Sequence, residues 1–233
     1  MANTKPRTAA VHRAAVTHTR SNTARSAIIA SCLEMNACGL NQGTSGNISM
    51  RVGNQMIITP SAVPYDELQP AMLASLKLDA ADAEFSGPLA PSSEWRFHAD
   101  ILRARPEVNA VVHAHPPYCT SLAIAHMEIP AAHYMVAAFG GNNVRCAGYH
   151  TFGTAALARA CVSALRERSA CLMANHGMLA IGTTLAKAMW TAVELEALAR
   201  QYYQALQIGG PKLLSDAAIA KTLAKFANYG LKK

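Results

Sequence analysis

The stretch NAVVHAHPPYCTSLA, residues 109–123, decides how this chain is read. Its valine- and alanine-rich start predicts a buried strand over 109–115, which two prolines end. Side chains two apart on a strand point to the same face, so His113 and His115 project together while Ala114 points away. Imidazole is the commonest metal ligand in proteins, and two on one face can bind one zinc ion. A histidine pair at a strand end is also a frequent polar rim, so this spacing alone leaves both interpretations open.

A third histidine occurs in a similar context. CLMANHGMLAIG, residues 171–182, places His176 after a short apolar strand, where it either caps a turn or joins the pair. Three histidines with an open fourth position make a catalytic zinc site. PSSEWRFH, residues 91–98, adds Glu94 in the first turn of an expected helix, where the helix dipole favours an acid. Glu94 is therefore either a dipole-favoured acid or the carboxylate that completes the metal site as ligand or base.

Three loops are rich in hydrogen-bond donors and contain no lysine. They are NQGTSGNIS at 41–49, TPSAVP at 59–64, and the Ser92-Ser93 pair at the helix start. None matches a nucleotide-binding P-loop. Each is either a simple turn or part of a pocket that holds a phosphate with neutral donors.

The net charge of +7 does not indicate nucleic-acid binding. Five cations precede the first acid, Glu34, and without them 16 basic residues face 14 acidic ones. No basic stripe with interleaved aromatics follows. Residues 1–21 are basic and acid-free, which is typical of an organelle transit peptide or of a disordered extension. Because no cleavage signal is evident, we expect a disordered basic extension over 1–21 and one domain over 22–233.

The remaining composition predicts a soluble, cytoplasmic protein that contacts neither membrane nor nucleic acid. Half of the residues are hydrophobic, yet no apolar run approaches the roughly 20 residues of a membrane span. The six cysteines show no CxxC spacing and indicate reduced, buried thiols. Cys119, near the histidine pair, is considered as a ligand or nucleophile, and a small core residue is the preferred interpretation.

Periodicity and turn residues predict interspersed strands and helices. Strands are expected at 47–51, 55–59, 73–78, 109–115, 171–175 and 178–182, with a hairpin turn at Gly53-Asn54 and a loop over 79–88. Helices are expected at 22–38, from Ser92 or Ser93 to 105, at 118–126, 154–168 and 184–207, and from Ser215 to about 227. The first would bury Ile28, Ile29, Cys32, Leu33 and Met35. The fold class is α/β: a single α/β/α domain with a mixed, largely antiparallel sheet covered by helices.

The same motifs carry a resemblance to a known family. In order and spacing, NQGTSGNIS, ITPSAVPYDEL, PSSEWRFHADI, NAVVHAHPPYCT, IPAAHYMVAAFGG and NHGMLAIG resemble the class II aldolase/adducin family. The likeness is strongest to its L-fuculose-1-phosphate aldolases and runs from about residue 22 to FANYGL at 226–231. Adducin-like members lack the metal histidines, whereas all three are present here.

The resemblance implies an activity, an assembly and a set of site residues. A zinc ion, one per subunit, would be bound by His113, His115 and His176, with Glu94 beside or on it as the base. Cleavage of a ketose 1-phosphate would give dihydroxyacetone phosphate and an aldehyde, in a homotetramer with active sites at subunit interfaces. Tyr134 would be lent by a neighbouring subunit, and Tyr229 would help to close over the substrate. The phosphate pocket would contain Thr44, Asn47, Ser61, Ala62, Ser92 and Ser93.

One position departs from the family pattern, because its aldolases usually have glycine where this chain has Ala62. If only the N–H contacts phosphate, alanine serves; if φ must be positive, the loop shifts. His98 and His133 lie in matched motifs and are interpreted as structural hydrogen-bonding residues.

The shared motifs leave other activities open. Sugar-phosphate epimerases, a methylthioribulose-phosphate dehydratase and decarboxylases use the same metal site. Aldolases for 5-deoxypentulose or methylthio-pentulose phosphates would keep every residue named. A non-catalytic scaffold would keep the fold without the metal.

Overall fold

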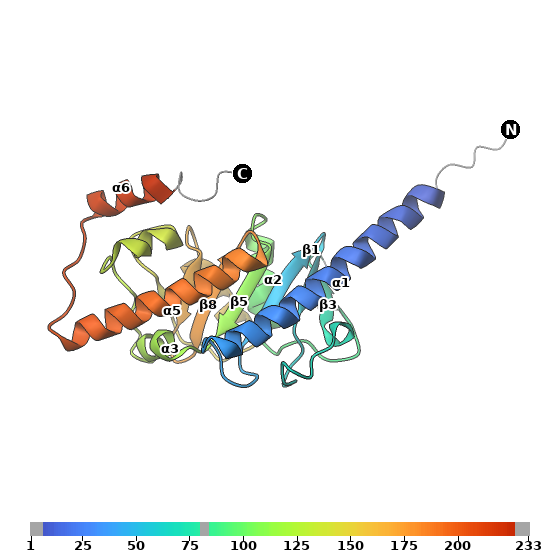
Figure 1. The fold of residues 1–233 in the computed structure, drawn as a ribbon, viewed down its shortest axis with the longest axis horizontal. Coiled ribbons are helices and arrows are strands. Elements are labelled where there is room, and N and C mark those ends of the chain that lie inside the picture. The colour runs from blue at the N-terminus through green and yellow to red at the C-terminus, as the bar shows by residue number, and fades with distance from the viewer. Residues whose placement is uncertain (1–6, 80–83, 227–233) are drawn as a thin grey trace.

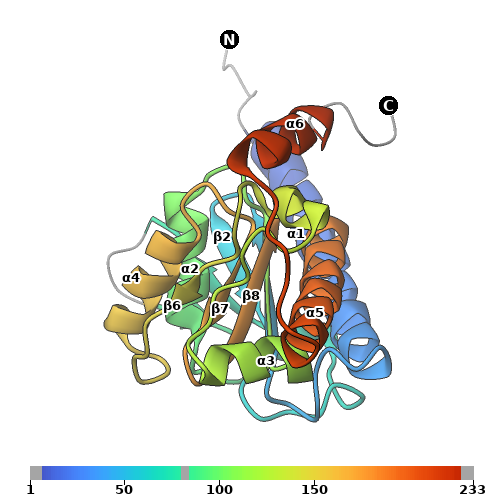
Figure 2. The same cartoon turned by 90° about the vertical axis from the view of Figure 1, so that its left-hand side faces the viewer.

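An eight-stranded sheet lies between two layers of helices. The computed structural model describes residues 7–79 and 84–226, with side chains from residue 19 onward. Helices α1, α3 and α5 cover one face of the sheet, and α2 and α4 cover the other (Figures 1 and 2). The predicted α/β/α arrangement is confirmed.

The sheet is mixed and almost entirely antiparallel, as predicted. Its strand order is β4-β3-β2-β1-β5-β8-β7-β6, and only the β6–β7 pair is parallel. Val52 pairs with Gln55, which confirms a two-residue turn at Gly53-Asn54. The strands are β1 Asn47–Val52, β2 Gln55–Ile58, β3 Ala74–Lys77, β4 Phe85–Ser86, β5 Ala110–Ala114, β6 Cys146–Ala147, β7 Ala170–Met173 and β8 Gly177–Gly182.

Helices α4, α5 and α6 begin at residues whose side chains accept a hydrogen bond from the first turn. Thr184 caps α5, and Ser215 accepts a hydrogen bond from Ala218 N at the start of α6, the cap that the sequence predicts. The helices are α1 Arg7–Ala37, α2 Trp95–Ala104, α3 Pro117–Ile124, α4 Ala155–Ala164, α5 Leu185–Gln207 and α6 Asp216–Phe226, with 3-10 helices η1 Pro70–Met72 and η2 Tyr134–Phe139.

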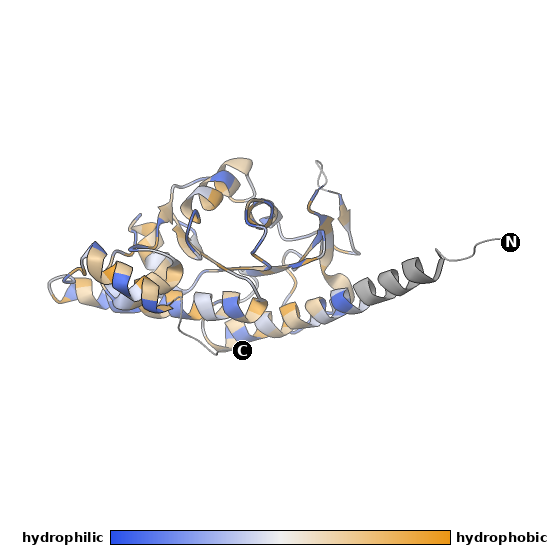
Figure 3. Cartoon of the chain, turned by 90° about the horizontal axis from the view of Figure 1, so that it is seen from above, coloured by the Kyte–Doolittle hydropathy of each residue, from blue (hydrophilic) through white to orange (hydrophobic). Residues whose placement is uncertain are grey.

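The two sheet faces carry separate cores. On one face, α1 and α5 pack on Ile48, Val112 and Met178. On the other, Phe97 of α2 and Leu157 of α4 belong to a second core. Seen from above, the helices on both sides of the sheet mix hydrophobic and hydrophilic residues (Figure 3), as expected of helices with one face in a core and one in water.

The first helix differs from its prediction in start and in buried face. α1 begins at Arg7, well before Asn22, because residues 7–21 contain neither Gly nor Pro to stop it. Its buried stripe is Ala24, Ile28, Cys32 and Met35, whereas Leu33 is 44% exposed. The 3.6-residue period places Leu33 off that stripe. The division into an extension over 1–21 and a domain over 22–233 stays a prediction.

Three smaller expectations are corrected. The loop expected over 79–88 contains β4, and β6 follows η2; both strands have two residues, too short for a periodic signal. All six cysteines are free, but Cys38 is exposed and Cys146 half-buried, so the thiols are not uniformly buried. Among the described helices, none combines the length and apolar character that crossing a bilayer demands.

Strand β5 is the centre of the sheet and is buried on both faces. It pairs with β1 on one side, His113 opposite Asn47, and with β8 on the other, His113 opposite Leu179. All five of its residues are buried, and His113 is its one polar side chain. An imidazole at such a position needs polar partners, since burial without them is costly.

The helix that follows β5 is held at its start by a carboxylate from another helix. Glu196 of α5 accepts hydrogen bonds from Tyr118 N at 2.9 Å and Cys119 N at 2.8 Å, in the first turn of α3. These N–H groups have no partner within their own helix, and the negative charge complements the helix dipole.

We expect Glu196→Gln to lower the free energy of unfolding by about 1–2 kcal/mol, because a charge-assisted pair of hydrogen bonds is lost. Urea denaturation measures this. Glu194→Gln, two residues away on α5, is the matched control and should change stability by less than about 0.5 kcal/mol. Equal effects of the two substitutions would contradict this account of the helix start.

Candidate metal centre

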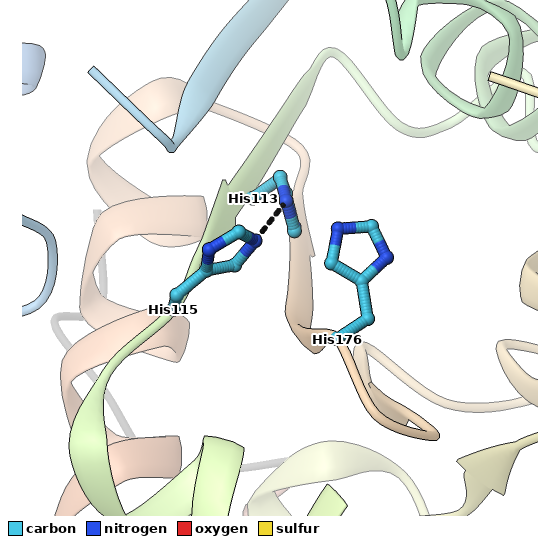
Figure 4. A group of neighbouring side chains, drawn as sticks. All are labelled: His113, His115 and His176. Atoms are coloured by element: carbon cyan, nitrogen blue, oxygen red, sulfur yellow. Dashed lines mark hydrogen bonds between the residues drawn. The ribbon is translucent and has the colours of Figure 1, made fainter. Parts of the chain in front are cut away.

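Three imidazoles from two separate segments converge on one point (Figure 4). His113 and His115 come from β5 and the residue after it, and His176 from the turn between β7 and β8. One ring nitrogen from each lies within 4.8 Å of the others. The Nε2 atoms of His113 and His115 are 2.9 Å apart. The predicted convergence of the three histidines is therefore present.

Glu94 completes the cluster from the helix layer. It occupies the N-cap position of α2 and is 6% exposed. Its Oε2 lies 3.1 Å from His113 Nε2, and its Oε1 lies 3.0 Å from His176 Nε2. The ring nitrogens and the carboxylate oxygens thus lie 2.9–3.1 Å from their neighbours, close to the separation of about 3.3 Å between nitrogen ligands of a tetrahedral zinc ion.

The donor set fits a divalent cation. His113 Nδ1 lies 2.9 Å from Met178 O, to which it donates, so in the neutral ring Nε2 presents a lone pair. That backbone contact is the outer partner that metal-binding histidines usually have. Glu94 Oε1 is buried and receives no hydrogen bond from the described residues. A cation would satisfy Oε1 and accept the lone pairs of the converging ring nitrogens.

Burial and neighbouring charge keep the groups in metal-binding forms. Burial lowers the pKa of His115 to about 3, with further lowering from His113 and His176, so the ring is neutral at pH 7. For Glu94, burial raises the pKa, but the interactions with the adjacent His113 and His176 rings outweigh it, and the net direction is downward. The carboxylate is therefore ionised.

Two glycines allow the backbone to approach the ligands. A Cβ on Gly177 would lie 2.5 Å from His115 Cδ2, and a Cβ on Gly46 would lie 2.7 Å from His113 O. Contacts that short do not occur between real atoms of these types, so any larger residue would displace a ligand. The glycine after His176 is needed for packing against His115.

The expected phosphate loops lie beside the cluster. Ser93 N donates to Ser61 Oγ at 3.0 Å, and Ser92 N donates to Thr59 O at 2.9 Å, which joins the second and third loops. Ser92 is buried, and its Oγ accepts from Glu94 N. Thr44 is exposed on the loop that leads into β1. Their role in phosphate binding stays a prediction.

Ala62 keeps the left-handed conformation that glycine would adopt easily. Its φ is +59°, and its side chain is exposed. The loop therefore does not shift to avoid a positive φ; instead, alanine takes a backbone conformation that L-residues adopt at a cost.

Tyr134 lies on the surface beside α6. Tyr134, on η2, is 51% exposed, and its ring contacts are with His133 and Phe226. It borders a hollow of about 1180 Å³ between η2, α5 and α6, whose lining includes neither Glu94 nor the three histidines. Tyr229 lies outside the described residues.

Cys119 lies in the core, as preferred from the sequence, and His133 and His98 form hydrogen bonds within the chain. Cys119 is fully buried in the core, and burial raises the pKa of its thiol well above the ordinary value. His133 Nδ1 accepts a hydrogen bond from Met135 N at the start of η2. His98 is fully buried, and burial, with a smaller effect of the His113 charge, lowers its pKa to about 3.

One connection of Glu94 is not predicted from the sequence. Asn47, expected to bind phosphate, has its amide bonded to Glu94 and to His98, and Ser49 bonds the far side of the His98 ring. The available signal was spacing: Asn47 and Ser49 are two apart on a strand, and Glu94 and His98 four apart on a helix.

The comparison with protein families decides the assignment. The model described as "Class II Aldolase and Adducin N-terminal domain" matches residues 26–203, most of the chain. The chain belongs to this family. It is a class II, metal-dependent aldolase, a carbon–carbon lyase, and its three histidines are consistent with the divalent metal of that class.

Curated relatives and a solved structure agree with the family. A 5-methylthioribulose-1-phosphate/5-deoxyribulose-1-phosphate aldolase of Rhodospirillum rubrum is 47% identical over 206 residues, which covers 88% of this chain and 92% of that protein. An L-fuculose phosphate aldolase of Escherichia coli K12 is also 47% identical, covering 88% and 94%. The structure of an L-fuculose 1-phosphate aldolase superposes with a TM-score of 0.84 at 33% identity, covering 88% of this chain and 96% of that one.

We expect Ala62→Gly to stabilise the protein by up to about 1 kcal/mol. Glycine removes the steric cost of a positive φ, which exceeds its extra unfolded-state entropy. Ala197→Gly, at an exposed position on α5, is the control and should destabilise by about 0.5–1 kcal/mol. Thermal unfolding of both variants measures the direction of each change in stability. Destabilisation by both would show that Ala62 is not strained.

Proposed function

We propose that the chain is a zinc-dependent aldolase that reversibly cleaves a ketose 1-phosphate, similar to L-fuculose 1-phosphate, into dihydroxyacetone phosphate and an aldehyde. The observation that carries this proposal is a buried, ionised carboxylate, that of Glu94, in contact with two of three convergent imidazoles. Nitrogen-rich ligand sets suit zinc. His113, His115 and His176 would hold the ion, with Glu94 beside or on it.

The metal supplies a Lewis acid that stabilises negative charge on substrate oxygens when the hydroxyl-bearing carbon loses its proton. Glu94 accepts that proton. Of its two oxygens, Oε2 accepts a hydrogen bond from Asn47 at 2.9 Å and lies near His113, whereas Oε1 has only the ring of His176, a ligand in this proposal, beside it at 3.0 Å. Oε1 is therefore the atom that takes the proton.

A second group must exchange a proton with the aldehyde oxygen. Tyr134 packs on Phe226 and is 51% exposed, and the hollow that it lines includes neither Glu94 nor the three histidines. Its exposure supports a role in the site of a neighbouring subunit, where its hydroxyl protonates the aldehyde oxygen as the bond forms. This assigns active sites to the interfaces of a homotetramer, with Tyr229 closing over the substrate.

The substrate phosphate is assigned to neutral donors. Thr44, Ser61, Ser92 and Ser93, with the N–H of Ala62, would bind it, and Asn47 would line the same pocket. The contact of Ser93 N with Ser61 Oγ brings the two serine loops to one place. A helix start that adjoins them favours an anion.

A second substrate class is favoured by the relatives. A 5-methylthioribulose-1-phosphate/5-deoxyribulose-1-phosphate aldolase and an L-fuculose phosphate aldolase are equally similar to this chain, at 47% identity each. Both classes release dihydroxyacetone phosphate and require the same metal, base and phosphate residues, so they differ only in the aldehyde end.

A substrate panel tests the proposal. Metal-replete protein should release dihydroxyacetone phosphate from L-fuculose 1-phosphate, measured by coupled reduction, and 5-methylthioribulose and 5-deoxyribulose 1-phosphates form the other arms. Chelator should abolish release, and added Zn²⁺ should restore it, since the carbanion depends on the metal. Conversion without dihydroxyacetone phosphate, to an epimer or a dehydrated product, would overturn the aldolase assignment for this substrate class.

We expect Glu94→Gln to lower kcat by about 10²–10⁴-fold, the usual contribution of a general base, while one metal per chain stays bound. The three imidazoles remain as ligands, so metal analysis should read the same as in wild type. Glu107→Gln, an exposed carboxylate, is the control and should keep full activity. Normal turnover by Glu94→Gln would remove Glu94 as the base.

A further inference from the structure

Behind Glu94 lies a chain of three buried hydrogen bonds that the reaction itself does not require. Asn47 Nδ2 donates to Glu94 Oε2 at 2.9 Å, His98 Nε2 lies 2.5 Å from Asn47 Oδ1, and Ser49 Oγ lies 2.8 Å from His98 Nδ1. None of the four residues exceeds 6% exposure. The chain ends at the carboxylate that would act as the base.

The chain follows from matched spacings on two elements. Glu94 and His98 are four residues apart at the start of α2, a rise of about 6 Å on one helix face. Asn47 and Ser49 are two apart on β1, a separation of about 6.6 Å on one sheet face. The helix and the strand therefore present their polar residues to each other in register.

The direction of the hydrogen bonds is determined by the carboxylate. An ionised Glu94 only accepts, so Asn47 must turn its NH₂ towards Oε2 and its Oδ1 towards His98. His98 must then carry its hydrogen on Nε2, which leaves Nδ1 as an acceptor for the Ser49 hydroxyl. The reverse direction would place Asn47 Oδ1 against Glu94 Oε2, two oxygens with no hydrogen between them.

We propose that His98 and Ser49 are positioning residues for the base: they fix the amide orientation of Asn47, which holds Glu94 Oε2 and leaves Oε1 to take the proton. This inference rests on the proposed function of Glu94. His98 and Ser49 touch neither the imidazole cluster nor, in our assignment, the substrate.

A purely structural role for His98 is a weaker explanation of the same contacts. The ring lies on the core face of α2 beside Phe97, where an apolar side chain would pack without needing partners. A buried imidazole costs free energy unless both nitrogens are satisfied, and here both are, in the one tautomer that the carboxylate demands.

The test compares two substitutions of His98 in the metal-replete enzyme. His98→Leu removes the donor to Asn47 and should lower kcat about 10–100-fold, the usual effect of losing such an outer partner, with KM and metal content unchanged. His98→Gln offers an amide N–H at the reach of Nε2 and should keep kcat within about threefold. Equal losses in the two variants, or no loss in either, would overturn the proposal.

A measurement on the unsubstituted holoenzyme keeps the proposal testable if His98→Leu does not fold. Solid-state NMR of protein with ¹⁵N-labelled histidine, assigned by the signal absent from His98→Gln, should show a neutral His98 ring protonated at Nε2 and hydrogen-bonded at Nδ1. Protonation at Nδ1 would reverse the chain and contradict the proposal. Ser49→Ala should shift the Nδ1 signal and lower kcat in the same direction.

The outcome separates this inference from the proposed function. If the wild-type enzyme releases no dihydroxyacetone phosphate from any of the three substrates, the proposed function fails, while the NMR result still decides the direction of the chain. If the wild type is active and His98→Leu is equally active, the positioning role fails and the proposed function stands.

Discussion

The pairing register of β5 is the constraint on which the site depends. His113 lies opposite Asn47 on one side and Leu179 on the other, and this places its ring on the face covered by α2. A slip of one residue would turn every side chain of β5 to the opposite face, sending the imidazole into the core beneath α1 and α5. The buried apolar neighbours on both faces oppose such a slip. The packing that forms the core therefore also orients the His113 ring towards the site.

Burial strengthens the hydrogen bonds of the site and makes any unpaired polar atom costly. Glu94, Asn47, Ser49, His98 and His113 are all buried against an apolar layer that includes Phe97 and Leu157. In such surroundings an unpaired polar atom is expensive, and each paired one is fixed in direction. The exception is Glu94 Oε1, which accepts no hydrogen bond. The cost of a buried oxygen without a hydrogen bond is tolerated where a bound cation or a transferred proton compensates for it.

Features that depend on residues close in sequence can be predicted from the sequence, whereas features that depend on distant segments cannot. The HxH spacing and the apolar run around it predict the face of β5 directly, because strand periodicity is local. The direction of Asn47 was not predictable, because it depends on a helix about fifty residues away that presents Glu94 and His98 at a matching rise. The prediction that Leu33 is buried is wrong, because the apolar residues of α1 do not by themselves show which face of the helix packs on the sheet. β4 and β6 are defined only by their pairing with neighbouring strands and are too short to show strand periodicity in the sequence.

Helix α3 connects the two segments that carry the histidines. It begins two residues after His115, and its first turn is held by Glu196. Near its other end, Ala123 O accepts from Asn175 N, and His126 Nε2 lies 2.5 Å from Asn175 Oδ1. Asn175, which precedes His176, and His126 both have positive φ, with values of +53° and +54°. Residues held in that conformation persist only where their surroundings over-determine them. One short helix thus ties the turn of the third histidine to the strand of the first two, so the geometry of the cluster is set by packing before any metal arrives.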